Sequence, residues 1–374
     1  MPHVYGTTIY NSIPSHSSHP LHKMHVNSSH SPTFKASISL SLSLSLLSLS
    51  CFSSIQMAAT TSPEVLLDVL PYLRVLKDGT IDRLAGTQVA PPGLDPKTGV
   101  LSKDIVIFPK TGVSARLYRP NTAKPAHKLP LIIYFHGGAF CIASAGEPLY
   151  HTSLNNLVAE ANAIGVSVNY RLAPEHPLPT AYEDCWAVLN WVFNGGKGRD
   201  SWVKDHVDFE RVFLVGDSAG ANIAHHLALR IKPSDPDPKL KIAGIGMINP
   251  YFWGKEPLGG EVGDLVRKSM VDTWWNFVCP SEKGCDDPLI NPFVGGSPGL
   301  EGLACDKILV LVAGKDILRD RGMLYYDELV KSKWGGRKEL IETQGEDHVF
   351  HIFNPNCDKA KILIGNLGKF INQD

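Results

Sequence analysis

The sequence predicts an α/β fold: a mostly parallel β-sheet flanked by helices. From about residue 104 onward, short β-rich runs alternate with helical patterns, which is typical of a wound α/β sheet. Several of these runs are continuous Val/Ile/Leu stretches, as expected of strands buried on both faces. One run ends in Gly-Asp-Ser-Ala-Gly (residues 216–220), and a helix-forming stretch follows it directly.

The period of the apolar residues places the individual elements. The expected strands are residues 105–108, 115–118, 131–135, 165–169, 212–215, 243–248, 308–312 and 339–342. The expected helices are residues 150–161, 181–193, 219–231, 265–277, 321–333 and 355–371. Before the first strand, the segment 63–100 opens with a helical pattern at 65–70. Its apolar face is expected to pack either on the rim of a pocket or on the sheet edge.

Composition limits what the chain can bind. The 374 residues include 36 Lys and Arg against 37 Asp and Glu, a formal net charge of −1 at pH 7. This balance lacks the basic excess of proteins that bind nucleic acids or anionic membranes, so we expect a small, largely uncharged ligand. The seven cysteines are widely spaced and show no zinc-binding pattern, which favours free thiols in a reducing compartment.

The first 56 residues differ from the rest of the chain. They contain sixteen serines and no Asp or Glu, and we expect such a polar segment to be disordered. It can be interpreted as a plastid transit peptide, as a secretory signal, or as an upstream artefact that precedes a true start at Met57. The chain has no run of about 18 apolar residues, so no transmembrane helix is expected.

Ser218 is the candidate nucleophile. A Gly-x-Ser-x-Gly turn between a strand and a helix is so tight that only small residues fit two positions away on either side. The turn exposes the Ser218 hydroxyl above the sheet. It also leaves the Ala219 N–H free at a helix N-terminus, where it can stabilise a developing negative charge.

A serine hydroxyl needs a base, and the base needs a third group to orient it. In a fold of this kind the acid precedes the histidine along the chain. Asp316 follows the strand 308–312, at the sheet edge where active sites gather. Asp306 lies at the opposite end of that strand, and Asp320 is better placed as a helix cap or first-turn residue.

Two histidines follow Asp316 in a position to act as the base. His348 lies near the apex of a loop after the strand 339–342. His351 already lies at the start of an apolar segment, where packing or capping explains it. The position of His348 therefore favours it as the base.

An oxyanion site is expected after the strand 131–135. That strand leads into His-Gly-Gly-Ala-Phe (residues 136–140), where successive small residues let backbone N–H groups converge on one point. Gly137 and Gly138, together with Ala219, are the expected donors.

Taken together, these motifs resemble the plant carboxylesterases of the hormone-sensitive-lipase-like group, from about residue 62 to the C-terminus. The resemblance rests on His-Gly-Gly-Ala-Phe (136–140), Asn-Tyr-Arg-Leu-Ala-Pro-Glu-His-Pro (169–177), Gly-Asp-Ser-Ala-Gly (216–220), Asp-Pro-Leu-Ile-Asn-Pro (287–292) and Gly-Glu-Asp-His-Val-Phe-His (345–351). One departure is Ala139, where many members of the group have a third glycine.

The resemblance implies an eight-stranded α/β-hydrolase core with an N-terminal cap. With the Ser-rich extension 1–56, which the pattern of the group does not include, the chain is expected to divide into that extension, a cap segment 57–103 and a catalytic domain 104–374. It implies a serine carboxylesterase that uses no cofactor or metal and hydrolyses short-chain acyl esters of small plant metabolites or xenobiotics. A monomer or weak homo-oligomer is expected in the cytoplasm, or in the plastid if the extension is a transit peptide. The site residues carried over are Ser218, Asp316 and His348 as the catalytic triad, with Gly137, Gly138 and Ala219 as the oxyanion hole.

Two relatives of that group keep other functions open. The 2-hydroxyisoflavanone dehydratases use the same oxyanion loop and base to eliminate water, so the sequence pattern also permits a lyase. Gibberellin receptors resemble the chain but lack the catalytic histidine. The presence of His348 therefore favours an enzyme over a hormone-binding receptor.

Overall fold

The computed structural model describes residues 64–194, 198–232 and 240–373. Its centre is a nine-stranded sheet with the order β12-β11-β10-β9-β7-β8-β6-β5-β4. The strands are β4 (Leu94–Asp95), β5 (Val100–Phe108), β6 (Val113–Pro120), β7 (Leu129–Phe135), β8 (Ile164–Asn169), β9 (Val207–Asp217), β10 (Gly244–Ile248), β11 (Lys307–Ala313) and β12 (Arg337–Thr343).

The predicted fold class is confirmed by this sheet. All eight expected strands are present, and β4, of two residues, pairs with β5 as a ninth. From β8 across to β12 the neighbouring strands are parallel. On the other side, β6, β5 and β4 are added antiparallel.

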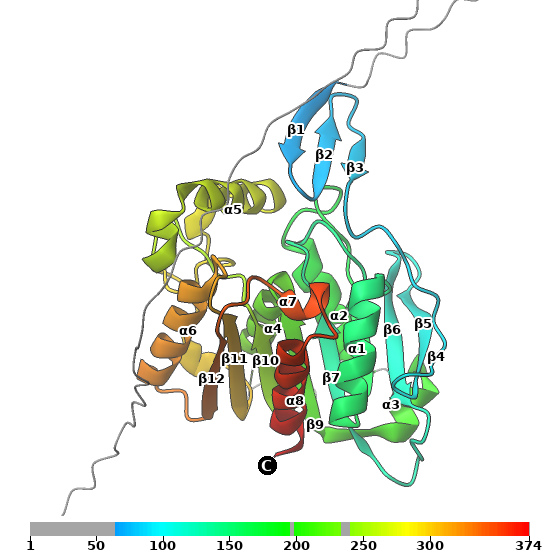
Figure 1. Cartoon of the computed structure of the whole chain (residues 1–374). Helices are drawn as coiled ribbons and strands as arrows, with labels where there is room; N and C mark the ends of the chain where they lie inside the picture. The colour runs from blue at the N-terminus through cyan, green and yellow to red at the C-terminus, as the bar shows by residue number, and fades with distance from the viewer. Residues whose placement is uncertain (1–63, 195–197, 233–239, 374) are drawn as a thin grey trace, which may run out of the picture. The chain divides into compact units, whose positions relative to one another are not determined.

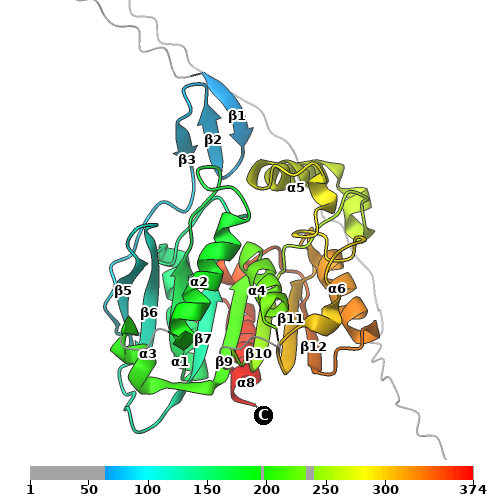
Figure 2. The ribbon, with the colours of Figure 1, turned by 180° about the vertical axis from the view of Figure 1, so that it is seen from behind.

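Helices cover both faces of the sheet. Helices α1 (Pro148–Ala161) and α8 (Asp358–Asn372) lie side by side on the face seen in Figure 1. Helices α2 (Thr180–Asn194), α4 (Ala219–Arg230) and α6 (Arg319–Lys331) cover the face seen in Figure 2. Beyond the sheet edge lies α5 (Leu265–Val278). The sequence patterns missed two short helices, α3 (Ser201–His206) and α7 (Phe350–Phe353).

Alternation along the strands explains why both faces need helices. In β7, Leu131, Ile133 and Phe135 belong to the core under α2 and α4, whereas Ile132 and Tyr134 belong to the core under α1 and α8. All five side chains are at most 1% exposed. A strand buried on both faces reads as a continuous apolar run, which is the pattern that predicted it.

The expected helix at 65–70 is wrong, because this segment is the strand β1 (Val65–Val69). It pairs antiparallel with β2 (Leu73–Leu76), which pairs with β3 (Ile81–Arg83) in a separate three-stranded sheet. The following Pro71 disfavours helical backbone at Leu70, and only Val69 of the strand is buried.

The expected boundaries need one further adjustment. The catalytic sheet includes β5 from Val100, so a boundary between residues 103 and 104 would cut through a strand. The Ser-rich extension 1–56 lies outside the described residues. None of the described helices is both long and apolar enough to cross a bilayer.

The strand order creates a crevice above the centre of the sheet. From β7 the chain adds β8 on one side and β9 on the other, so the connections leave in opposite directions. In open α/β sheets ligands bind at such a switch point, outside the carboxyl ends of the strands. The loop after β7 and the turn after β9 carry the motifs at 136–140 and 216–220.

Candidate active site

Ser218 lies in a strained turn between β9 and α4. Its backbone has φ 53° and ψ −118°, a sparsely populated conformation for a residue with a side chain. A Cβ at Gly216 would overlap the backbone of Gly220, and a Cβ at Gly220 would overlap the carbonyl oxygen of Phe135. The two glycines are therefore required by close backbone approach.

His348 joins Ser218 to Asp316. Its Nε2 lies 2.9 Å from Ser218 Oγ, and its Nδ1 lies 2.8 Å from Asp316 Oδ2. Burial by itself lowers the pKa of His348. The nearby carboxylates, Asp316 foremost, raise it by more than burial lowers it, so the pKa of His348 is above its ordinary value. The three side chains come from loops after β9, β11 and β12, which meet at one edge of the sheet.

Asp316 is itself held by the backbone and by Asn249. Its Oδ1 accepts from the Leu318 N–H at 2.9 Å, and its Oδ2 accepts from Asn249 Nδ2 at 2.9 Å. Asn249 follows β10 with a left-handed φ of 46°. Sequence reasoning did not single out Asn249, because a lone asparagine after a strand has no distinguishing signal.

The rival residues take structural roles. Asp320 lies in the first turn of α6, where it accepts from the Gly260 N–H at 2.6 Å and pairs with Arg319 at 2.5 Å. Asp306 precedes β11, at the opposite end of that strand from Asp316. His351 is 1% exposed, neither ring nitrogen bonds any described residue, and burial lowers its pKa to about 3.

The oxyanion loop differs from the expectation at one residue. The Gly137 N–H already donates to Tyr150 Oη at 3.0 Å and to Asp217 Oδ1 at 3.1 Å. It is therefore not available to a ligand, and the expectation for Gly137 is corrected. Nothing in the sequence marks this, since Tyr150 and Asp217 lie 13 and 80 residues further along the chain.

The next two N–H groups of the loop are free. Among the described residues, none accepts from the N–H of Gly138, Ala139 or Ala219. The Gly137 carbonyl contacts His136 Nδ1 at 2.8 Å, and the Gly138 carbonyl accepts from the backbone. The C=O of one residue and the N–H of the next point in opposite directions across a trans peptide. The N–H groups of Gly138 and Ala139 therefore point away from the groups that contact the Gly137 and Gly138 carbonyls.

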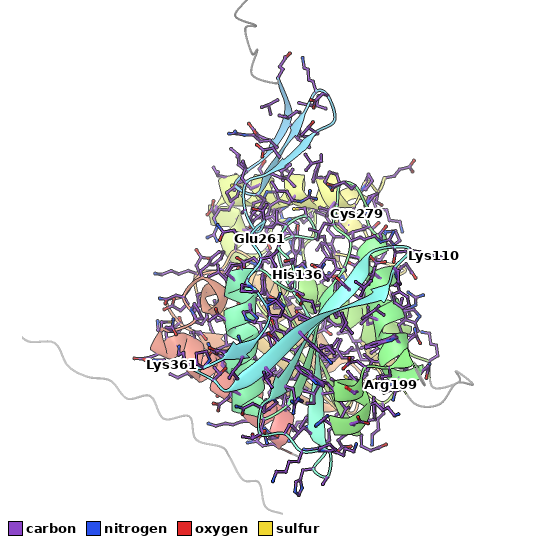
Figure 3. All side chains as sticks on the ribbon, turned by 90° about the vertical axis from the view of Figure 1, so that its right-hand side faces the viewer. Lys110, His136, Arg199, Glu261, Cys279 and Lys361 are labelled. Atoms are coloured by element: carbon purple, nitrogen blue, oxygen red, sulfur yellow. The ribbon has the colours of Figure 1, made fainter. Side chains whose placement is uncertain are left out.

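Tyr170 supports the loop through both its hydroxyl and its ring. Its hydroxyl donates to the carbonyl oxygens of His136 at 2.7 Å and Gly137 at 3.3 Å, and its ring stacks on the His136 imidazole with centroids 4.3 Å apart. His136 is fully buried above the central strands (Figure 3), and burial lowers its pKa to about 4. A neutral His136 is therefore part of the scaffold of the loop.

A cavity of about 590 Å³ opens above Ser218 and His348. Gly138 and Ala139 also line it, and its remaining walls are mainly apolar. These walls include Pro71, Tyr72, Ala85, Ile142, Ala143, Leu149, Tyr150, Tyr251, Met270, Val271, Trp274, Ile317, Leu318, Val349, Ile352 and Phe353. The charged groups at the lining are Glu147, Arg267 and Asp347, and Arg267 pairs with Asp347 at 2.9 Å.

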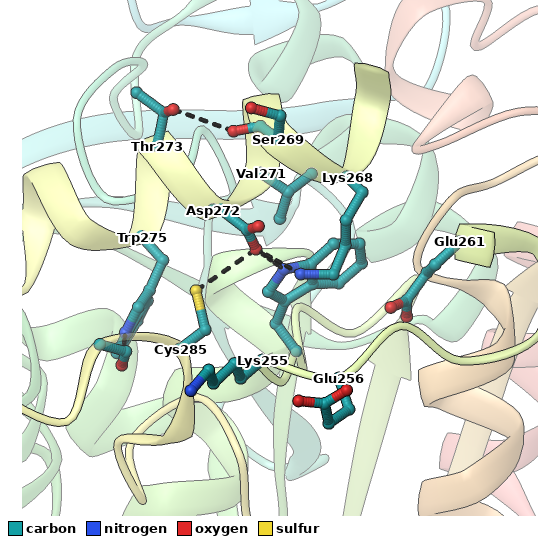
Figure 4. A network of polar contacts seen from close by, with 12 residues as sticks. Lys255, Glu256, Glu261, Lys268, Ser269, Val271, Asp272, Thr273, Trp275 and Cys285 are labelled. Atoms are coloured by element: carbon teal, nitrogen blue, oxygen red, sulfur yellow. Dashed lines mark hydrogen bonds and ion pairs between the residues drawn. The ribbon is translucent and has the colours of Figure 1, made fainter. Parts of the chain in front are cut away.

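Helix α5 forms one wall of the cavity and is anchored by a partly buried polar network (Figure 4). Asp272 accepts from Lys268 Nζ at 2.6 Å, from Trp253 Nε1 at 2.6 Å and from Cys285 Sγ at 3.4 Å. Lys268 Nζ also lies 5.0 Å from the centre of the Trp253 ring. These contacts fix the helix that carries Met270, Val271 and Trp274 into the pocket wall.

The described residues contain no group of three His, Cys, Asp or Glu side chains arranged to hold a metal ion. Six cysteines are described, all free: Cys141, Cys185, Cys279, Cys285, Cys305 and Cys357. Burial raises the pKa of Cys141 and Cys285 to about 12, so these two thiols are not activated nucleophiles.

Comparison with known proteins agrees with this geometry. Residues 132–352 match a family model described as the alpha/beta hydrolase fold. A probable carboxylesterase of Arabidopsis thaliana is 60% identical over 84% of this chain and 98% of its own length. A 2-hydroxyisoflavanone dehydratase of Glycyrrhiza echinata is 45% identical over 84% of this chain and 98% of its own. A chloroplastic tuliposide A-converting enzyme of Tulipa gesneriana is 44% identical over 82% of this chain and 79% of its own.

Solved structures share the fold. A hyperthermophilic esterase from the archaeon Pyrobaculum calidifontis is 26% identical, with a TM-score of 0.60 over 73% of this chain and 84% of its own. A thermostable carboxylesterase cloned from a metagenomic library is 27% identical, with a TM-score of 0.61 over 75% of this chain and 90% of its own. The chain belongs to the plant carboxylesterase family of α/β-hydrolase-fold proteins.

Proposed function

We propose that this protein is a serine carboxylesterase that hydrolyses esters of small, uncharged molecules. The observation that carries the proposal is the continuous chain of contacts from Ser218 Oγ through His348 to Asp316, at 2.9 and 2.8 Å, at the floor of an apolar cavity. Distances of this length are those needed for proton transfer between a nucleophile, its base and an orienting acid.

The reaction proceeds through an acyl-serine. Ser218 Oγ attacks the ester carbonyl carbon while His348 Nε2 takes the hydroxyl proton, and Asp316 stabilises the imidazolium that forms. His348 returns the proton to the leaving alcohol as the C–O bond breaks. Water then attacks the acyl-enzyme with His348 again as base, which releases the acid and restores Ser218.

The negative charge on the tetrahedral oxygen is stabilised by backbone donors. We assign this role to the N–H groups of Gly138, Ala139 and Ala219, with Ala139 in place of Gly137. The first two lie in the loop after β7 and the third lies at the N-terminus of α4, where the helix dipole adds to the effect. Each such donor is worth about 10²–10³ in rate.

Replacement of the nucleophile tests the proposal. The purified full-length chain is expected to release p-nitrophenol from p-nitrophenyl butyrate, and Ser218→Ala is expected to lower kcat by about 10⁴-fold or more. Ser269→Ala, on the exposed side of α5, is the matched control and should leave kcat unchanged. If Ser218→Ala keeps most of the activity, Ser218 is not the nucleophile.

The dehydratase relative gives a second candidate function. Water elimination needs the base and the oxyanion donors but no acyl-serine. The same protein is therefore assayed with a 2-hydroxyisoflavanone. An elimination rate above the ester hydrolysis rate that survives Ser218→Ala would favour the lyase. The receptor alternative is disfavoured by the contact of His348 with Ser218.

Compartment and assembly remain part of the proposal. We place the enzyme in the cytoplasm as a monomer or weak homo-oligomer, and in the plastid instead if the extension 1–56 acts as a transit peptide. The free thiols of the described cysteines support a reducing compartment. Microscopy of the full chain fused to a fluorescent protein distinguishes the two locations.

A further inference from the structure

Asp217 is a buried carboxylate that the catalytic steps above do not use. It is the last residue of β9, lies directly before Ser218 and is fully buried. No lysine, arginine or histidine among the described residues forms an ion pair with it. Burial raises the pKa of Asp217 to about 6, and a buried carboxylate without an ion-pair partner is costly, so its retention as an anion calls for strong hydrogen bonds.

Three neutral donors from separate elements meet on this carboxylate. Tyr134 Oη, from β7, donates to Oδ1 at 2.8 Å, and Tyr150 Oη, from α1, donates to Oδ2 at 2.8 Å. The third donor is the Gly137 N–H, at 3.1 Å from Oδ1. Tyr134, Tyr150 and Asp217 are each at most 6% exposed, so water does not compete for these bonds.

The fit around Gly137 is too close for any other residue. A Cβ on Gly137 would overlap Asp217 Oδ2 and would lie 2.8 Å from Tyr150 Oη. The Gly137 N–H is shared between the Tyr150 hydroxyl and the Asp217 carboxylate. The oxyanion loop is thus clamped at its first glycine.

This clamp, formed by Gly137, Tyr150 and Asp217, lies one residue before each of the two parts of the reacting site, the oxyanion donors and the nucleophile. Gly138 and Ala139 follow Gly137, and Ser218 and Ala219 follow Asp217. The two loops follow neighbouring strands, β7 and β9, which pair as far as Phe135 and Gly216, and the clamp continues this connection into the loops themselves. A shift of about 1 Å at a site of this kind costs about 10² in rate.

We infer that Asp217 is a positioning residue, which, with Tyr150, holds the Gly138 and Ala139 N–H donors in register with Ser218 for the charge of the tetrahedral intermediate. This inference rests on the proposed esterase function and deepens it. Asp217 touches neither the substrate nor Ser218 Oγ. Its contribution is therefore expected in the stabilisation of the transition state and not in substrate binding.

Asp217→Asn and Tyr150→Phe test the inference. The amide replaces one acceptor atom with a donor, and the phenylalanine removes the hydroxyl that bridges Gly137 and Asp217. Steady-state kinetics with p-nitrophenyl butyrate are normalised to the number of active sites by titration with p-nitrophenyl diethyl phosphate. A trifluoromethyl ketone, which forms a tetrahedral adduct with the serine, serves as the transition-state probe.

In both variants kcat is expected to fall about 10- to 100-fold with KM within about threefold, and the ketone is expected to bind more weakly by a similar factor as kcat. Tyr118→Phe is the matched control, because Tyr118 is also fully buried and contacts His151 at 3.0 Å without touching the oxyanion loop. A purely structural role would lower the melting temperature in all three variants but leave the normalised kcat and the ketone affinity unchanged.

The inference is overturned if normalised kcat and ketone affinity in Tyr150→Phe remain within twofold of the wild type. That variant decides the question should Asp217→Asn fail to fold. Absence of turnover by the wild type would instead contradict the proposed function. The two failures are therefore distinguishable within one experiment.

Discussion

At the scale of single residues, the electrostatics around His348 determine the pH dependence of the reaction. Only the neutral imidazole can accept the Ser218 proton. Three carboxylates, Asp316, Asp217 and Asp347, favour the imidazolium and raise the pKa of His348 despite its burial. We expect kcat/KM to rise with pH through a midpoint above the ordinary histidine value of 6.5.

Asp347→Asn tests the sign of this effect. Removal of that carboxylate destabilises the imidazolium and takes from Arg267 its partner at 2.9 Å, so the acidic limb of the kcat/KM profile should move to lower pH. The shift is expected to be small, because the Asp347 side chain is 55% exposed and solvent screens it. Asp358→Asn, 93% exposed on α8, is the control and should not move the limb. A shift to higher pH would contradict this account.

Residue order explains how much of the site could be predicted. Ser218, Asp316 and His348 each follow a strand of the parallel sheet, so their carboxyl-end positions could be inferred from local patterns and from their order along the chain. The role of Gly137 could not be inferred in this way, because that role depends on which side chains from other elements reach the loop. Tyr134 and Tyr150 have no motif of their own, and Tyr170 was visible only as part of the motif at 169–177.

At the scale of elements, Arg83 joins the sheet β1–β3 to the catalytic core. Its guanidinium donates to the carboxylate of Glu175 at 2.7 and 2.6 Å, to the Cys141 carbonyl at 2.9 Å and to the Ala173 carbonyl at 3.0 Å. Glu175 and Ala173 belong to the motif at 169–177, and Cys141 follows the oxyanion loop. The motif thus provides the anchor for the segment that places Tyr72 in the pocket wall.

Arg83→Lys is expected to loosen this anchor. Lysine keeps the charge but cannot reproduce the planar fork that contacts Glu175 and two carbonyls together, and charge-assisted hydrogen bonds are worth about 1.5–3 kcal/mol each. We expect KM for p-nitrophenyl butyrate to rise roughly three- to tenfold and amide hydrogen exchange in residues 64–83 to accelerate.

The control for this variant is Arg74→Lys. Arg74 pairs with Asp68 inside the same small sheet, with both side chains more than 40% exposed, and such pairs contribute about 1 kcal/mol or less. Its KM should remain that of the wild type. Equal KM values in the two variants would show that the contacts of Arg83 do not shape the pocket.

The same region shows where element prediction failed. The apolar residues at 65–70 fit a helical period, yet Val65–Val69 pairs with Leu73–Leu76 as a strand. Short apolar runs do not distinguish a helix from a strand by period alone. The turn between β2 and β3 is made at Asp78 and Gly79, where Gly79 has a φ of 86° and Asp78 accepts from the Thr80 N–H at 2.9 Å.

At the scale of the whole molecule, a nearly neutral chain carries an apolar cavity, and both features favour the uncharged esters proposed as substrates. The formal net charge is −1, so long-range steering of ions is weak. The cavity of about 590 Å³ is larger than a short-chain ester requires, which leaves room for a longer acyl group or a bulkier alcohol. Apart from the catalytic His348, the basic residue among the described lining residues is Arg267, which is already paired with Asp347.

A series of p-nitrophenyl esters tests this selectivity. Butyrate carries two more methylenes than acetate, and each buried methylene contributes about 0.8 kcal/mol, so kcat/KM should rise about tenfold from acetate to butyrate. The anionic hydrogen succinate should react at least tenfold more slowly than its methyl-capped, neutral analogue, because its carboxylate must leave water for a wall without a free cation. Comparison of these two succinates keeps the shape nearly constant and changes the charge. If the anion is the better substrate, Arg267 exchanges Asp347 for the substrate carboxylate. The natural substrates of the protein would then be esters that carry a carboxylate, and not the neutral esters inferred from the cavity.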